Sequence, residues 1–149
     1  MAVILIRDEY GDDCVNIDVQ ARTFPNSENS WDKNHLDSPS VVHVGGFIGQ
    51  IPARFHTWDL QKFRDELSQL YEKLEGEALL STVEGWITST CKGDGLGHIS
   101  LVGGATDEMG NGDRLNFEFK MDQTFLPDIL SQLDDVLAKF PKLDGIQLQ

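Results

Sequence analysis

The amino-acid sequence predicts an α+β domain: an antiparallel β-sheet of about seven to eight strands, rich in hairpins, with two amphipathic helices packed on it. Three observations carry this prediction. The 149 residues suit one globular domain, covering 1–149, that buries an ordinary hydrophobic core. The extended segments each show one apolar face, and two segments show an apolar stripe at helical spacing. These segments follow one another as strands, helix, strands and helix.

The N-terminal segments are predicted to be strands. Residues 2–7 form a short apolar run that ends at an acidic turn, residues 8–13. Residues 15–22 then alternate between apolar and polar side chains, the pattern of a strand with one wet face. Residues 25–40 contain two prolines and many small polar residues, so a long polar loop is expected, with Trp31 in its middle.

The middle of the chain is predicted to contain further strand and the first helix. Residues 41–55 are extended, and the glycines at 45, 46 and 49 indicate a bulge or a tight hairpin. A helix is expected over 58–74, where Thr57 suits the N-cap and Gly76 the C-terminal end. Its apolar stripe consists of Leu60, Phe63, Leu67, Leu70 and Leu74.

The second half repeats the order of strands followed by a helix. Strands are predicted at residues 77–91, 98–106 and 115–121, with glycine-containing turns at 92–97 and 107–113 between them. The last of these strands shows the clearest alternation in the chain, because four apolar residues alternate with polar ones. Antiparallel hairpins are therefore expected after the first helix as well as before it.

A second helix is expected over residues 125–140. Pro127 suits its first turn, and Pro141 ends it, leaving 142–149 as a short tail. The tetrapeptide Leu67-Ser68-Gln69-Leu70 recurs as Leu130-Ser131-Gln132-Leu133, each time on a predicted helix that follows strands. This echo makes an internal β–α duplication a candidate feature of the fold.

Charge decides which classes of partner fit. Twenty-five acidic residues against twelve basic ones give a formal net charge of −13. Such a surface repels nucleic acids and anionic membranes and attracts basic proteins, although solubility alone is the plainer explanation. No segment approaches the roughly 20 apolar residues of a membrane span, and the first residues resemble a strand rather than a secretion signal. A cytoplasmic protein with reduced cysteines is expected.

Catalytic signatures are missing from the sequence, so a binding protein is predicted rather than an enzyme. There is no GxSxG elbow, no HExxH helix and no P-loop. The best enzyme candidate is Cys91 with Asp94 and His98, because a tight hairpin would bring the thiol and the imidazole together as nucleophile and base. The plainer interpretation is that these residues are structural.

Neither a metal nor a cofactor is predicted. Asp107, Glu108, Asn111 and Asp113 offer oxygen atoms in one glycine-rich turn, but their spacing is not that of an EF-hand calcium loop. The four histidines show no zinc-ligand spacing. The acidic turns are therefore more readily explained as contact surfaces for a partner.

Acidic turns and one tryptophan are the predicted contact residues. A tryptophan in a polar loop is either folded back onto the core or offered to a partner, and tryptophan is over-represented in binding hot spots. The predicted partner-binding set is Asp12, Asp13, Trp31, Asp107, Glu108 and Asp113.

A series of motifs between about residues 42 and 140 resembles one family. The series runs Gly46-Phe47-Ile48-Gly49, Asp59-Leu60-Gln61-Lys62-Phe63, Gly76-Glu77-Ala78-Leu79-Leu80, Glu84-Gly85, Gly97-His98, Leu115-Asn116-Phe117-Glu118-Phe119 and Asp122-Gln123-Thr124-Phe125-Leu126. It is similar to the small bacterial proteins of the WapI immunity type. This resemblance implies a cytosolic antitoxin that protects its cell from a wall-associated polymorphic toxin. It carries over no catalytic or binding residue.

The charge and the resemblance together predict an immunity protein that inhibits a basic, nuclease-like toxin by stoichiometric binding. Secreted nucleases are usually basic because they grip a polyanion, and complementary charge speeds association. Two alternatives stay open. One is a small enzyme that uses Cys91 and His98. The other is a structural or regulatory domain that self-associates, for example as a homodimer.

Overall fold

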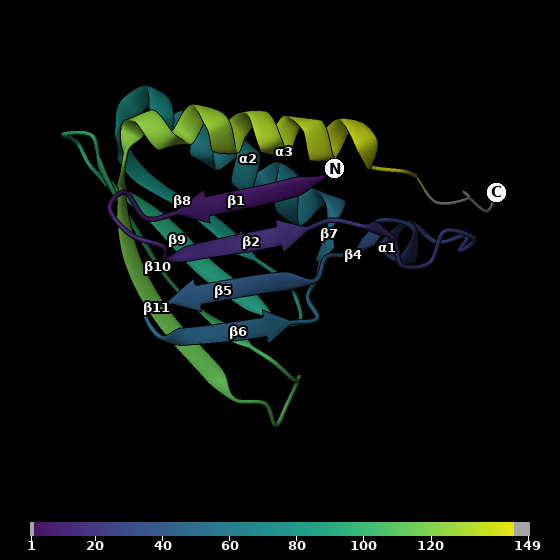
Figure 1. The fold of residues 1–149 in the computed structure, drawn as a ribbon. Helices are drawn as coiled ribbons and strands as arrows, with labels where there is room; N and C mark the ends of the chain where they lie inside the picture. The colour runs from purple at the N-terminus through teal and green to yellow at the C-terminus, as the bar shows by residue number, and fades with distance from the viewer. Residues whose placement is uncertain (1, 145–149) are drawn as a thin grey trace.

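The computed structural model describes residues 2–144, which form three antiparallel sheets, two long helices and two short helical turns (Figure 1). The predicted α+β class and the two helices are confirmed. The strands are more numerous than predicted, from β1 to β11, and they divide among three sheets instead of forming one. Within the described residues, no helix combines the length and the apolar character needed to cross a membrane.

The first sheet comes from the N-terminal half of the chain. Its order is β1-β2-β5-β6, with β1 at Val3–Arg7, β2 at Cys14–Asp18, β5 at Ser40–Val44 and β6 at Phe47–Ile51. The fully buried side chains of this sheet, all on one face, are Ile4, Ile6, Val15, Ile17 and Val42. The turn at Gly45 and Gly46 joins β5 to β6, so the glycines mark a tight hairpin.

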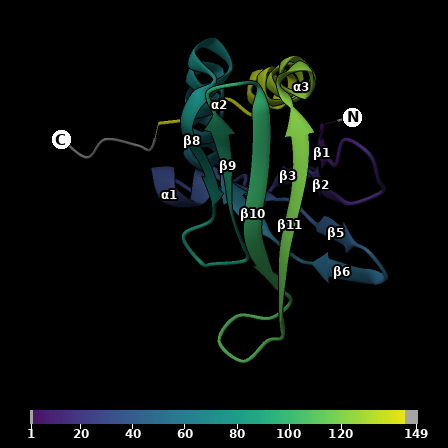
Figure 2. The same cartoon turned by 90° about the vertical axis from the view of Figure 1, so that its left-hand side faces the viewer.

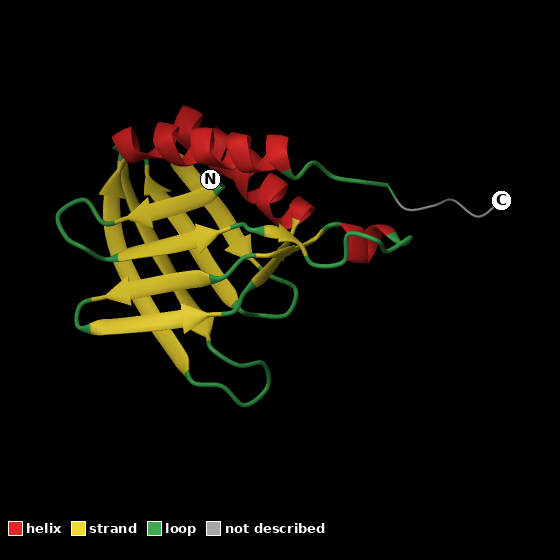
Figure 3. Cartoon of the chain, turned by 45° about the vertical axis from the view of Figure 1, so that its right-hand side comes forward, coloured by secondary structure: helices red, strands yellow, loops and turns green. Residues whose placement is uncertain are grey.

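The second sheet comes from the C-terminal half. Its order is β8-β9-β10-β11, with β8 at Glu75–Ser81, β9 at Ile87–Asp94, β10 at His98–Thr106 and β11 at Arg114–Asp122. Its inward face carries Ala78, Leu80, Ile87, Cys91, Ile99, Leu101, Phe117, Phe119 and Met121. Figure 3 shows this sheet crossing behind the first, so the apolar faces of both meet in one core.

A third, small sheet and a short helix occupy the segment predicted to be a polar loop. The sheet pairs β3 (Ala21–Arg22), β4 (His35–Asp37) and β7 (Arg54–His56), and helix α1 is Ser30–Lys33. The loop prediction for residues 25–40 is therefore wrong in its second half. The polar residues that indicated a loop serve as caps: Asn29 Oδ1 accepts from the Asp32 N–H at 2.8 Å.

The two long helices lie together at one side of the molecule. Helix α2 is Thr57–Lys73, and helix α3 is Leu126–Lys139, which follows the 3-10 turn η1 at Gln123–Phe125. They pack on each other, α2 beside β8 and α3 beside β1, as Figure 2 shows from the side. The residue that ends α2 in the left-handed conformation is Leu74 (φ 60°), not Gly76, which lies in β8.

The two large sheets have the same strand arrangement. Each is a four-stranded antiparallel sheet whose strands are neighbours in chain order, and a long helix comes after it; β3, β4 and β7 of the third sheet interrupt the first half alone, so the internal duplication stays a prediction. Of the repeated tetrapeptide, Leu67, Leu70 and Leu133 are buried, and Leu130 packs against the core. The predicted tail begins as extended chain, and Leu143 exchanges two hydrogen bonds of 2.7 Å with the Asn34 side chain. Residues 145–149 lie outside the described residues.

Candidate functional site

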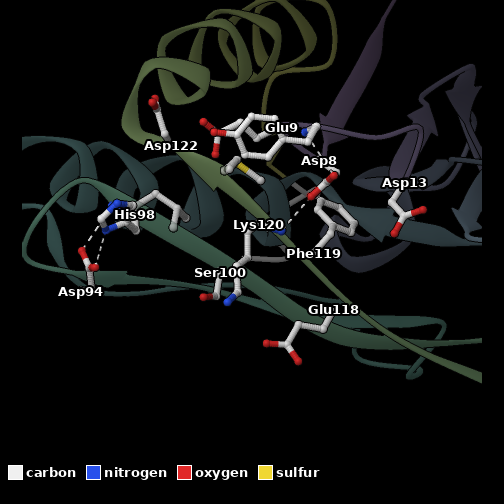
Figure 4. A pocket seen from close by; sticks show the side chains of 13 residues that line it. Asp8, Glu9, Asp13, Asp94, His98, Ser100, Glu118, Phe119, Lys120 and Asp122 are labelled. Atoms are coloured by element: carbon white, nitrogen blue, oxygen red, sulfur yellow. Dashed lines mark hydrogen bonds and ion pairs between the residues drawn. The ribbon is translucent and has the colours of Figure 1, made fainter.

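A groove of about 920 Å³ lies between the β1–β2 turn and strands β10 and β11 (Figure 4). Six of its lining residues are carboxylates: Asp8, Glu9, Asp13, Asp94, Glu118 and Asp122. Lys120 and His98 are its basic lining residues. We call this feature the acidic groove. The groove is negative, as is the chain as a whole. Because the carboxylates lie together in a concave surface, a cationic group is attracted there most strongly.

The β1–β2 turn is fastened to the edge of β11 and forms one wall of the groove. The Glu9 N–H donates to the Lys120 carbonyl at 2.8 Å, and the Lys120 N–H donates to Asp8 Oδ1 at 3.0 Å. The other carboxylate oxygen of Asp8 accepts from the Tyr10 N–H at 3.2 Å. Asp8 therefore holds the turn in register with β11 and fixes the position of Tyr10.

Tyr10 projects from this turn at the mouth of the groove. Tyr10 is 91% exposed, more than any other large hydrophobic residue of the described chain. The neighbouring Glu9 carboxylate raises the pKa of Tyr10, so the phenol keeps its proton at neutral pH and remains a hydrogen-bond donor. An exposed tyrosine beside carboxylates suits a binding partner that offers both an apolar contact and a cation.

The β9–β10 turn forms the opposite end of the groove. Asp94 Oδ1 accepts from the backbone N–H groups of Leu96 (2.7 Å) and His98 (3.2 Å), and Asp94 Oδ2 lies 2.7 Å from His98 Nδ1. The hydrogen bond from Leu96, followed by that from His98, lowers the pKa of Asp94. This carboxylate therefore stays ionised at neutral pH.

Asp122 faces His98 across the β10–β11 pair and is also kept ionised. The side chain and backbone of Thr124 both donate to Asp122, and these hydrogen bonds lower the pKa of its carboxyl group. Asp94, His98 and Asp122 thus form a row across three strands, as Figure 4 shows. Such a row can bind a guanidinium or an ammonium group, because ionised carboxylates accept charge-assisted hydrogen bonds.

The structure separates the sequence-predicted contact residues. Asp13 lines the groove, and its Oδ1 accepts from the Gly45 N–H at 2.8 Å. Asp12 lies in the same turn but is not among the lining residues, and its carbonyl oxygen lies 3.1 Å from His43 Nδ1. The two aspartates are therefore neighbours with different surroundings.

Asp107, Glu108 and Asp113 lie in the β10–β11 turn, at the far end of these strands from the groove. On β11, four residues of extended strand, about 13 Å, separate Glu118 in the groove from Arg114 at that turn. Asp107 Oδ1 accepts from the Asp113 N–H at 2.9 Å, which stabilises the turn itself. These three acids are thus separate from the acidic groove.

Trp31 lies in α1, where it both packs and stays accessible. Its ring is 4.1 Å from the His56 ring and 5.5 Å from the Trp58 ring between centroids, and its side chain is 48% exposed. Beneath it the buried rings of His35 and His56 meet edge to face at 4.7 Å. In the part of the chain that the structure describes, His35 Nδ1 and His56 Nε2 have no hydrogen-bond partner. This cluster lies apart from the groove.

The pairing of Cys91 with His98 is wrong. Strand β9 continues to Asp94, so the residue paired with Cys91 on β10 is Leu101. Cys91 is fully buried on the inner face, which raises the pKa of its thiol to about 12, whereas His98 is exposed on the outer face. A buried, protonated thiol is not a nucleophile, so this enzyme candidate is excluded. The partner of His98 is Asp94.

Metal chemistry has no candidate ligand set in residues 2–144. No three side chains of histidine, cysteine, aspartate or glutamate lie close enough together there to hold an ion.

The sequence had singled out Asp13, Asp94 and His98 for other reasons, but it gave no sign that they line one groove. The outward alternation of Glu118, Lys120 and Asp122 on β11 shows only that these side chains share one face of a strand, which later forms the floor of the groove.

The comparisons with known proteins give a family and a fold. The family model described as the Immunity protein WapI-like family matches residues 5–141, most of the chain. The search of curated proteins gives no match. Among solved structures, a chain from the crystal structures of Trypanosoma bruciei MRP1/MRP2 is similar, with a TM-score of 0.51 and 8% sequence identity. The similarity covers 92% of this chain and 84% of that chain, and it shows a shared fold alone.

Proposed function

Because the chain belongs to the WapI-like immunity protein family, we propose that it neutralises a basic, nuclease-like bacterial toxin by binding it one to one. The acidic groove is the proposed contact surface. One observation carries this proposal: carboxylates from three separate parts of the chain line a single groove beside an exposed tyrosine. A nuclease needs a cationic surface to hold a polyanion, and the groove offers carboxylates to that same surface.

The mechanism follows from charge and burial. Complementary charge draws the toxin to the groove and raises the association rate, most strongly at low salt. Tyr10 then supplies the apolar contact, because tyrosine adds buried area at a small cost in side-chain entropy. Asp94 and Asp122 hold an arginine or lysine of the toxin that would otherwise bind a phosphate. Inhibition thus needs no catalytic residue, cofactor or metal. The proposed place of action is the cytoplasm, where the free thiols of Cys14 and Cys91 stay reduced.

The test compares two pairs of charge-neutralising substitutions. Glu9→Gln with Glu118→Gln removes two carboxylates from the groove, and the one side chain to which either is hydrogen-bonded is the exposed Tyr10, beside Glu9. Glu108→Gln with Asp113→Asn removes two carboxylates from the distant β10–β11 turn and is the matched control. Each pair changes the net charge equally, so long-range attraction falls equally in both.

The probe is a basic nuclease toxin domain encoded beside the gene for this chain, and binding is measured by surface plasmon resonance. Exposed charge pairs contribute about 0.2–1 kcal/mol each, so the groove pair is expected to weaken binding about 2- to 30-fold. Both pairs lower the association rate alike, so the additional loss of the groove pair falls on the dissociation rate, where direct contacts act; affinity for the toxin decreases as salt rises from low to physiological ionic strength. Equal losses for the two pairs, or affinity independent of salt, would contradict the groove as contact surface.

A further inference from the structure

The terminal strands of the two large sheets differ in how their outer edges are covered. The edge of β1 is capped by α3, because the Leu5 N–H donates to Gln132 Oε1 at 2.8 Å. The edge of β8 is capped by α2, because the Leu79 N–H donates to Glu66 Oε1 at 3.0 Å. Exposed strand edges associate readily, and proteins usually cover them in this way. Both edges on the helical side of the molecule are therefore protected.

The terminal strands on the opposite side are β11 and β6, and their outer edges are covered to different extents. The β1–β2 turn covers part of β11, through the 2.8 Å hydrogen bond from the Glu9 N–H to the Lys120 carbonyl. β11 also carries charged residues, a second means of edge protection. For β6, no described hydrogen bond reaches beyond β5, and its residues Phe47–Ile51 include no charge and no proline. β6 is the unprotected edge among these four terminal strands of the described chain, and Figure 1 shows it farthest from the helices.

The register of the β5–β6 hairpin identifies the backbone groups that stay free. Val44 pairs with Phe47 across the two-residue turn, so the hydrogen-bonded pairs include Phe47, Gly49 and Ile51. The N–H and C=O groups of Ile48 and Gln50 therefore point to the open edge. Ile48 is 65% exposed and Phe47 is 69% exposed, so large apolar side chains accompany these free polar groups.

We propose that β6 pairs antiparallel with β6 of a second copy of this chain. Centred on Gly49, this pairing sets Ile48 of one copy opposite Gln50 of the other and joins two four-stranded sheets into one continuous sheet. A strand paired with itself in this way obeys two-fold symmetry, the commonest symmetry of soluble homo-oligomers. Each copy contributes one strand of five residues, so the interface belongs with those of weak, reversible dimers.

Charge favours a second copy as the occupant of this edge. A chain of net charge −13 repels its own copies at most surfaces. The outward side chains of β5 and β6, those of Val41, His43, Ile48 and Gln50, include no carboxylate, so two copies meet there with little local repulsion. A basic partner gains nothing from this neutral strand and is drawn to the acidic groove instead. The two surfaces therefore suit different partners.

The test is the oligomeric state of the full chain, without toxin, by sedimentation velocity and light scattering. A dimer is expected to form over concentrations from about 10 µM to about 1 mM, the range of weak association. Its dissociation constant falls as salt rises, because salt screens repulsion between like-charged copies. Affinity for the toxin is expected to fall as salt rises, the opposite of dimer affinity. The two measurements therefore show separately whether the dimer proposal or the toxin proposal fails.

Three substitutions locate the interface. Gln50→Pro removes a free N–H without touching the bonds to β5, and Ile48→Lys sets a charge on the edge; each is expected to weaken the dimer about tenfold or more. Val41→Lys is the control, because Val41 lies on the same face but one strand away from the edge. Circular dichroism shows whether each variant folds. If Gln50→Pro does not fold, Ile48→Lys still tests the interface.

Three results would overturn the proposal. The first is a monomer throughout the concentration range. The second is a dimer that Val41→Lys abolishes and Ile48→Lys leaves intact. The third is a monomer whose affinity for the toxin domain falls with Ile48→Lys, which would assign this edge to the toxin.

Discussion

Replacing Asp8 with alanine tests whether the acidic groove depends on the attachment of the β1–β2 turn to β11. The carboxylate of Asp8 accepts from the Lys120 N–H at 3.0 Å and from the Tyr10 N–H at 3.2 Å. Asp8→Ala removes both acceptors, so the turn loses one of its two hydrogen bonds to β11 and its hold on Tyr10. The remaining attachment is the hydrogen bond from Glu9 to the Lys120 carbonyl.

The expected loss of stability follows from these two hydrogen bonds. A net contribution of about 0.5–1.5 kcal/mol each is usual, and these two are solvent-accessible, so the total is about 1–2 kcal/mol. For a domain of this size that lowers the Tm by about 2–8 °C. Toxin affinity should fall further than the loss of one charge explains, because Tyr10 is no longer held at the mouth of the groove.

Asp12→Ala is the matched control for this prediction. It removes the same charge from the same turn, but no described hydrogen bond uses the Asp12 carboxylate. Urea denaturation gives the stability of both variants, and surface plasmon resonance gives the affinity. If Asp8→Ala and Asp12→Ala lower stability and affinity by the same amount, the reasoning is refuted and the turn contributes charge alone.

Two further predictions concern buried groups. Burial and the neighbouring His35 lower the pKa of His56 from its usual 6.5 to about 4, so its contribution to stability is present above pH 6.5 and is lost as the pH falls to about 4. Urea midpoints should therefore drop more over this window for the wild type than for His56→Phe; equal drops would show that other groups control acid stability. Iodoacetamide should leave Cys91 unmodified in the native protein and alkylate it after unfolding, because burial raises the pKa of the thiol to about 12. Mass spectrometry that finds native Cys91 alkylated as fast as Cys14 would contradict this.

The helices and most strands were predictable because one periodicity governs each of them. The predicted helices at 58–74 and 125–140 match α2 and α3 within one or two residues at each end. The residue that terminates α2 was predicted wrongly, because Leu74 takes the left-handed conformation that the sequence suggested for Gly76. Close packing explains why the helix ends there. A Cβ on Gly93 would lie 2.3 Å from the Leu74 carbonyl oxygen, so the C-terminal end of α2 lies very close to β9.

The division into three sheets was not predictable, since strand periodicity does not say where a strand leaves one sheet for another. Residues 15–22 alternate without a break, yet Cys14–Asp18 pairs in the first sheet and Ala21–Arg22 in the third. The acidic groove was hidden for a related reason. Asp8 and Lys120 meet although 112 positions separate them, and no local pattern records that contact.

The hydrogen bond between Leu5 and Gln132 has a consequence for how the protein is made. The two residues are 127 positions apart in the chain. At about 5–20 residues per second, a ribosome therefore adds Gln132 about 6 to 25 seconds after Leu5 in β1, the strand whose edge Gln132 covers. Until then the nascent first sheet carries two open edges, β1 and β6, instead of one. A chaperone that shields extended segments would therefore matter most late in translation, before α3 leaves the exit tunnel.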